Sequence, residues 1–201
     1  GNSKISDLWL IEDYWAIWLG ALILVIGSVI YFSNAPKDLD AKIATANSVM
    51  QEQAEYAPFK TVAYYDAQDS KGKLKATNSP VGKAIKSWTS KPKKWTSNPL
   101  DAFYMDKAAA DSLNAKYKPK YEAAAADTKA AKMAALTAQA AAAQASFTNA
   151  SFNDEAISKI STWRTARQIS KKAKKKIKHK PYNLFPSLLG LCLAMAVMFS
   201  V

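Results

Sequence analysis

The sequence predicts an all-α membrane protein in which two transmembrane helices flank a large, mostly helical polar insertion that is rich in alanine and lysine. Residues 14–32 and residues 184–201 carry no charged side chain. Each stretch is close to the roughly 20 residues that a helix needs to cross a bilayer. Residues 33–183, between them, hold the excess positive charge of a chain whose net charge is +12.

This pattern divides the chain into four segments. Residues 1–13 are predicted to be a short extracytoplasmic N-terminus, residues 14–32 the first transmembrane helix, residues 33–183 a polar helical insertion in the cytoplasm, and residues 184–201 the second transmembrane helix. The given sequence stops inside that last apolar stretch, so we expect more of the protein to follow Val201. The first residues lack the basic region and the small-residue cleavage site of a secretory signal peptide, so the first span is interpreted as a retained anchor.

Aromatic side chains gather at the two ends of the first span. A ring with one polar edge favours the headgroup level of a membrane, so these side chains predict an interfacial aromatic belt. The belt consists of Trp9, Tyr14, Trp15, Trp18 and Tyr31.

Small residues in both spans are predicted helix-packing positions, because they let helix backbones approach closely in lipid. Ala16, Gly20 and Gly27 recur at roughly helical spacing in the first span, and Gly190 and Ala194 form a small-xxx-small pair in the second. The alternative interpretation is that glycine and alanine are simply common in membrane helices.

The first part of the insertion is predicted to be one helix followed by irregular chain. Residues 38–56 show a narrow apolar stripe at helical spacing, which needs a partner helix or a membrane surface. The stripe consists of Leu39, Ile43, Ala46 and Met50. Residues 57–105 contain repeated proline and glycine, which predicts irregular structure.

Alanine dominates the second part of the insertion. Residues 122–146 should be helical, because alanine has the best intrinsic helix propensity, and Pro119 is expected to break or kink the helix. Asn153 is a predicted N-cap for a further helix that could continue to Lys180. Joined around residues 146–153, the two helices would form a hairpin that returns the chain to the membrane. A spacer and an antiparallel coiled coil are the alternatives.

A dense run of lysines precedes the second span. It consists of Lys171, Lys172, Lys174, Lys175, Lys176, Lys178 and Lys180. The positive-inside rule places such a run in the cytoplasm, which puts the N-terminus outside. The same lysines would attract anionic lipid headgroups, by about 1 kcal/mol for each lysine near the surface.

Tryptophan and lysine also alternate within residues 86–95, where Trp88 and Trp95 lie among lysines. Such a pattern can bind single-stranded nucleic acid, because bases stack on the rings while lysine neutralises phosphate. The stretch is short and has no repeat or fold signature. We therefore favour packing or membrane-surface anchoring, and nucleic acid is disfavoured as a partner.

The sequence contains none of the common motifs of catalysis or cofactor binding: no H-E-x-x-H, no C-x-x-C, no phosphate-binding glycine loop and no nucleophile elbow. The one histidine, His179, lies in the lysine run, and the one cysteine, Cys192, lies in the second span, where it is interpreted as a small packing residue. We therefore expect no enzymatic activity, no cofactor and no metal. No catalytic or substrate-binding residue is assigned.

Three short pieces carry a resemblance to a known family. Residues 12–20 (EDYWAIWLG) combine an acidic pair, a tryptophan-rich run and an early glycine, with Tyr14 in the place of a usual tryptophan. The others are residues 95–102 (WTSNPLDA) and residues 180–183 (KPYN). Together with the alanine-rich and basic stretches, they resemble longer members of the sulfate exporter family (YeiH-type) of bacterial inner-membrane transporters. The resemblance implies further membrane helices and a transport path through the later ones.

The leading hypothesis is therefore the N-terminal portion, or a split subunit, of a polytopic transporter that exports sulfate or another small anion. Its expected partners are the lipid bilayer, especially anionic lipid, and further transmembrane helices from the remainder of the protein, another subunit or an oligomer. The alternative is a two-span accessory subunit that presents a helical hairpin to a larger complex. A membrane-tethered binder of nucleic acid or lipid surfaces is the third hypothesis.

Overall fold

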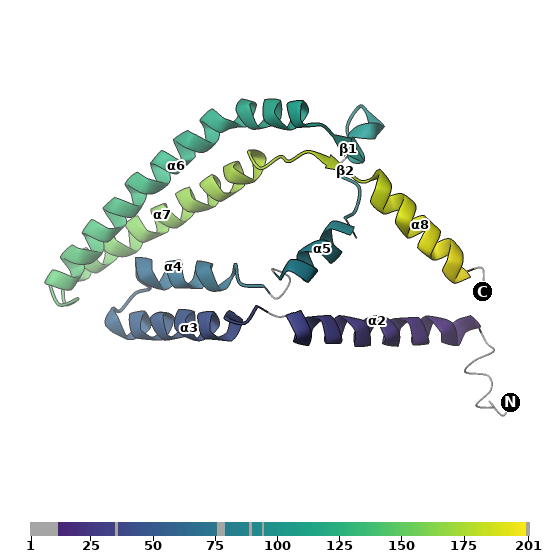
Figure 1. Ribbon diagram of the computed structural model, residues 1–201. Coiled ribbons are helices and arrows are strands. Elements are labelled where there is room, and N and C mark those ends of the chain that lie inside the picture. Colours follow the sequence, from purple (N-terminus) through teal and green to yellow (C-terminus); the bar gives the residue numbers. More distant parts are fainter. Residues whose placement is uncertain (1–11, 35, 76–78, 89, 94, 200–201) are drawn as a thin grey trace.

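The computed structural model describes residues 12–34, 36–75, 79–88, 90–93 and 95–199 (Figure 1). Within these ranges, the side chains of residues 12–16, 88, 198 and 199 are not described.

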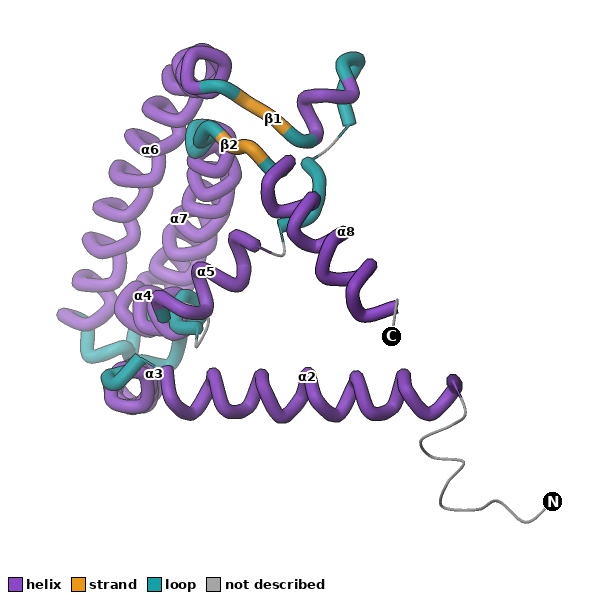
Figure 2. The backbone as a smooth tube through the Cα atoms, turned by 45° about the vertical axis from the view of Figure 1, so that its right-hand side comes forward, coloured by secondary structure: helices purple, strands orange, loops and turns teal. Residues whose placement is uncertain are grey.

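Helices dominate the described chain. The α-helices are α2 (Glu12–Asn34), α3 (Leu39–Tyr56), α4 (Val62–Lys71), α5 (Pro80–Trp88), α6 (Lys107–Gln144), α7 (Ala150–Lys176) and α8 (Phe185–Phe199). A 3-10 helix, η2 (Pro99–Ala102), and two short strands, β1 (Tyr104–Met105) and β2 (Tyr182–Asn183), complete the elements. Figures 1 and 2 show α6 and α7 side by side as a long hairpin, with α3 and α4 near its closed end and α2 and α8 extending away from that end.

The predicted hairpin is confirmed, and alanine explains how its helices approach each other. Ala135, Ala138 and Ala142 of α6 are buried, and they cluster with residues of α7. A methyl side chain takes little space, so two helices whose contact faces carry alanine can pack closely. Ser146 and Phe147 reverse the chain with φ values of 52° and 59°, in the left-handed region that allows a tight helix C-terminus.

The ends of these two helices differ from the prediction. Asn149, rather than Asn153, is the N-cap of α7, because its side-chain oxygen accepts from the backbone N–H groups at 151 and 152. Asn153 instead donates to the carbonyl of Phe147. α7 ends at Lys176, before the proline that was expected to stop it. α6 begins well before the alanine-rich stretch and runs through Pro119 as one helix, which is bent in Figure 1.

The sequence predicted irregular structure for residues 57–105. This prediction is wrong in part, because these residues include α4, α5 and η2. Thr61 explains the start of α4: its buried hydroxyl accepts from the N–H of Tyr64 and donates to Gln53 of α3. The N–H of Val62 donates to the side chain of Gln139 on α6, at 3.0 Å. Side chains of α3 and α6 thus fix the first turn of α4, which a local reading of proline and glycine could not reveal.

The predicted stripe on α3 is confirmed. Ala46 is buried, and Leu39, Ile43 and Met50 are half-buried. Its partner is α4, which packs along α3.

The core of the described chain is small and centres on Trp163 of α7. This indole is 1% exposed and packs with Ile160, Val62 of α4 and Ala135 of α6, and Phe59 and Tyr65 border the cluster. Because three helices meet at one side chain, Trp163 fixes the position of α4 on the hairpin.

We expect Trp163→Ala to lower the free energy of unfolding of the hairpin region by about 3–5 kcal/mol, since it leaves a cavity between three helices. The measurement is urea unfolding followed by far-ultraviolet circular dichroism. Ile157→Ala is the matched control on the same helix: this side chain is 48% exposed, so its loss should cost about 0.5 kcal/mol or less. Equal losses in both variants would contradict the central role of Trp163.

Candidate functional site

Helix α2 presents an uncovered apolar surface. Among the described residues, it is the one helix that is long and apolar enough to cross a membrane, over Ile17–Asn34, and none of that window is buried within the chain. Leu24 is 73% exposed and Phe32 is 80% exposed. A surface of this kind suits contact with lipid or with other membrane helices.

Helix α8 is apolar but shorter. Its 15 described residues cover about 22 Å, less than the roughly 30 Å of a bilayer core. Leu189 and Val197 are exposed, so this helix is also uncovered on at least one side. The second membrane span therefore stays a prediction.

The residues predicted for the aromatic belt and for helix packing fall into two groups. Trp9 lies outside the described residues, as do the side chains of Tyr14, Trp15 and Ala16. Most of the described residues of these two sets are exposed. Trp18, Tyr31 and Ala194 are exposed and Gly190 is half-buried. A Cβ placed at Gly20 or Gly27 would meet nothing within 4 Å. The belt and the packing faces stay predictions, because their partners would be lipid and other chains.

The seven lysines of the predicted run are all exposed. Two of them also make contacts within the chain. Lys171 forms an ion pair with Asp69 of α4, and the ammonium of Lys176 lies 5.5 Å from the centre of the Tyr117 ring on α6. The run therefore exposes its charge to solvent, and its first lysine, Lys171, also connects α7 to α4.

An ion-pair cluster joins α4 to the hairpin. Asp66 accepts from Lys132 of α6 at 2.8 Å and from Arg167 of α7 at 2.5 Å. Asp69 accepts from Nε of Arg167 at 2.9 Å and from Lys171 at 2.6 Å. One guanidinium thus connects both carboxylates, and it is only 19% exposed.

Sequence reasoning missed this cluster. The signal was present: the two carboxylates are three positions apart, and Arg164, Arg167 and Lys171 recur at three and four positions, so each set lies on one helix face. What the sequence lacked was any indication that these two faces meet.

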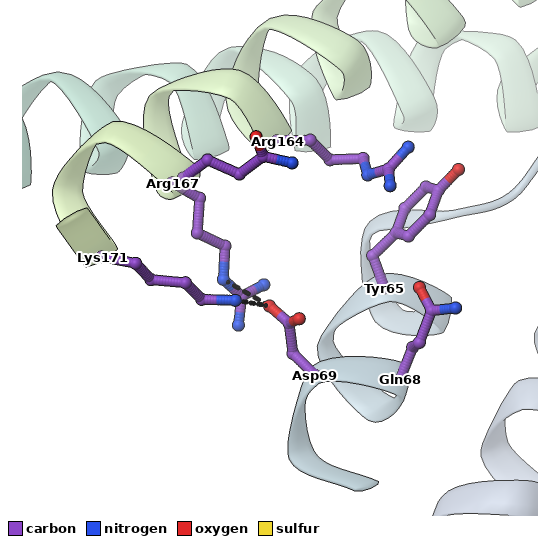
Figure 3. A pocket seen from close by; sticks show the side chains of 7 residues that line it. Tyr65, Gln68, Asp69, Arg164, Arg167 and Lys171 are labelled. Carbon is purple, nitrogen blue, oxygen red and sulfur yellow. Dashed lines mark hydrogen bonds and ion pairs between the residues drawn. The ribbon is translucent and has the colours of Figure 1, made fainter. Parts of the chain in front are cut away.

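A small pocket lies beside the cluster, between α4 and α7 (Figure 3). Its cavity volume is about 60 Å³. Arg164, Arg167 and Lys171 reach toward it from α7, and Tyr65, Gln68 and Asp69 face them from α4. The guanidinium of Arg164 lies over the Tyr65 ring, 3.9 Å from its centre, which is a cation–π contact.

The cations beside Asp69 control its ionisation. Partial burial by itself raises the pKa of the Asp69 carboxyl, but the hydrogen bond from Lys171 and the charges of Arg167, Lys171 and Lys73 outweigh it, so the pKa lies below its ordinary value of 3.8. Asp69 is therefore a carboxylate at neutral pH.

The second notable arrangement is at the start of α8. Residues 95–102 and residues 180–183, two of the three stretches that resemble a known family, meet there. β1 pairs antiparallel with β2, with Tyr104 opposite Asn183. Tyr182 donates to the backbone carbonyl of Asp101, and burial, followed by the Asp101 charge, raises the pKa of this phenol. The ring of Phe103 stacks on Phe185 of α8. Residues 95–105 and 180–185 thus form one junction that fixes where α8 begins.

A backbone clamp secures the segment between α7 and this junction. The side chain of Asn114 on α6 donates to the carbonyl of His179 and accepts from its N–H, each at 2.9 Å. His179 is half-buried, and its Nδ1 has no hydrogen-bond partner in the described part of the chain. The described residues contain no group of three or more histidine, cysteine, aspartate or glutamate side chains that could hold a metal ion.

Comparisons with known proteins identify relatives. Two UPF0324 membrane proteins of Nitratidesulfovibrio vulgaris are 47% and 48% identical to this chain over all 201 residues, which cover 35% of each relative. A UPF0324 membrane protein of Rhodopirellula baltica is 30% identical over 117 residues, which are 48% of this chain and 22% of that protein. No family model matches the chain, and no solved structure matches it.

The homologues of this chain are thus UPF0324 membrane proteins, and the chain spans about a third of the length of the two Nitratidesulfovibrio relatives. Their description supports a membrane location for this chain, in agreement with the uncovered surface of α2. It does not mention sulfate or transport.

The lowered pKa of Asp69 predicts how acid affects the α4–hairpin contact. A carboxyl whose pKa is lower in the folded state stabilises that state above its ordinary pKa of about 4, and the contribution is lost as the pH falls through the folded pKa. We expect the stability difference between the parent and Asp69→Asn to be constant from pH 7 to about pH 5 and to shrink below about pH 4. Urea unfolding at each pH measures it. A difference that grows on acidification would contradict the assignment.

Proposed function

We propose that this chain supplies the first two membrane helices and the cytoplasmic helical hairpin of a polytopic inner-membrane transporter that exports sulfate or another small anion. The observation that carries the proposal is the uncovered apolar surface of α2 in a chain that matches about a third of longer membrane proteins. The resemblance of residues 12–20, 95–102 and 180–183 to the sulfate exporter family supports sulfate or another small anion as the transported substrate. The proposal assigns no catalytic residue, cofactor or metal to the chain.

Further membrane helices are needed under this proposal, for a physical reason. A polar path through a bilayer must be enclosed by several helices, and two helices of one monomer cannot surround it. The window Ile17–Asn34 has no acidic or basic side chain that could bind an ion directly. The exposed Gly20 and Gly27 offer close approach to helices from the remainder of the protein, another subunit or an oligomer.

The proposed orientation places the hairpin in the cytoplasm and the N-terminus outside. It rests on the lysine run, whose members are exposed at the end of α7 and in the segment that leads to α8. In this position the same lysines would face the anionic cytoplasmic leaflet, so anionic lipid is the proposed bilayer partner.

Cysteine labelling tests the orientation. In a Cys192→Ala background, we expect a cysteine at exposed Ser158 of α7 to react with a membrane-impermeant maleimide only after spheroplasts are permeabilised. A cysteine in place of Ser3 should react in intact spheroplasts. The reversed pattern would invert the proposed topology, and the Cys192→Ala protein without either new cysteine gives the background.

Anion flux tests the function. We expect liposomes that contain the full-length protein to release radiolabelled sulfate faster than protein-free liposomes, and deletion of residues 12–201 to abolish the difference because the first helices are then missing. Release of labelled alanine is the specificity control. Sulfate and phosphate release at the protein-free rate would contradict anion export, and release that survives the deletion would show that this part is dispensable.

The alternative function is an accessory membrane subunit that presents the hairpin to a larger complex. The long, mostly polar hairpin favours it, because this structure extends well beyond the membrane helices (Figure 1). Absence of flux, together with a stoichiometric larger partner in native mass spectra of complexes from the source membrane, would select this alternative.

A further inference from the structure

We propose that the pocket between α4 and α7 binds one small tetrahedral oxyanion, such as inorganic sulfate or phosphate. The pocket belongs to the hairpin region rather than to the apolar helices (Figure 3). The inference therefore does not rest on the proposed transport function.

The charge around the pocket is the first reason. Three cations line the pocket, from Arg164, Arg167 and Lys171, together with one carboxylate, from Asp69. Two positive charges are left in excess. Among the described residues, no carboxylate pairs with Arg164, so its guanidinium contributes a charge that the chain itself does not neutralise.

The geometry of the donors is the second reason. Arg164, Arg167 and Lys171 lie on one face of α7, and Gln68 opposes them from α4. Arg167 uses Nε for Asp69 and one terminal nitrogen for Asp66, which leaves its other terminal nitrogen. A guanidinium presents its N–H groups in a planar fork that matches two oxygens of a tetrahedral anion. Tyr65 holds the Arg164 fork in place by stacking beneath it.

The size and access of the pocket set the ligand class. A cavity of about 60 Å³ has room for roughly four to six water-sized groups, at about 10–15 Å³ each. This volume suits sulfate or phosphate. Arg164 and Gln68 are exposed, so an ion can enter from solvent without unfolding of either helix.

A bound anion would act on the contact between the two helices. α4 connects through α3 to the apolar helix α2, whereas α7 leads to α8. An oxyanion that accepts hydrogen bonds from both α4 and α7 would tighten this contact, because it binds only when the two faces are together. Anion concentration would thereby control how firmly α4 docks on the hairpin.

Equilibrium dialysis with radiolabelled sulfate tests the proposal, on the full chain in dodecyl maltoside and at constant ionic strength set with sodium chloride. We expect one saturable site per chain. Arg164→Gln should weaken binding at least about tenfold, which is the effect of losing one charge-assisted hydrogen bond. Lys172→Gln is the matched control: it removes the same charge from the same helix, but Lys172 does not line this pocket, so affinity should change by less than about twofold.

A second variant separates a specific site from general charge attraction. Asp69→Asn removes the carboxylate that competes with the anion for Arg167 and Lys171, so sulfate should bind more tightly. Each variant enters the comparison only if its near-ultraviolet circular dichroism matches that of the parent, because the site requires α4 to stay docked on the hairpin and Asp69 contributes to that contact. The proposal is overturned by absence of saturable binding, by equal weakening in Arg164→Gln and Lys172→Gln, or by unchanged or weaker binding in Asp69→Asn.

Discussion

The described structure depends on the burial of one indole. Trp163 lies where α4 meets α6 and α7, in contact with Val62 and Ala135. Trp163 is the largest buried side chain in a core that otherwise consists of alanine, Val62 and Ile160, and the hydrophobic contribution of a side chain grows with the area that it removes from water. Without this contact, α4 would be held on the hairpin mainly by partly exposed ion pairs, the Val62–Gln139 hydrogen bond and the Arg164–Tyr65 cation–π contact.

Ion pairs specify the arrangement that Trp163 stabilises. Exposed ion pairs are worth little on their own, typically about 0–1 kcal/mol, but Arg167 is mostly buried and connects Asp66 and Asp69 at once. The same guanidinium lies over the Trp163 ring, 5.0 Å from its centre. Apolar burial therefore brings α4 and α7 together, and the charged groups select the register in which they meet.

The chain combines two surfaces that require different surroundings. The hairpin exposes lysine and short polar side chains, as a structure in water does, whereas α2 exposes leucine, isoleucine and phenylalanine. The junction of residues 95–105 and 180–185 connects the hairpin to the second apolar helix, α8, and there β1 and β2 pair and Phe103 stacks on Phe185. A short strand pair suits this position, because it fixes the direction of the chain as it enters an apolar helix.

The sequence by itself determined the apolar helix α2, the stripe on α3 and the alanine-rich hairpin, because charge-free runs, helical spacing and alanine propensity are local properties. It missed α5, it missed α4, whose first turn depends on the distant side chain of Gln139, and it misplaced the ends of α7. Only the tertiary structure decided the ion-pair cluster and its pocket. Arg167 and Lys171 lie 101 and 102 positions from their carboxylates, and no local pattern indicates which of many charged faces will meet when Trp163 is buried.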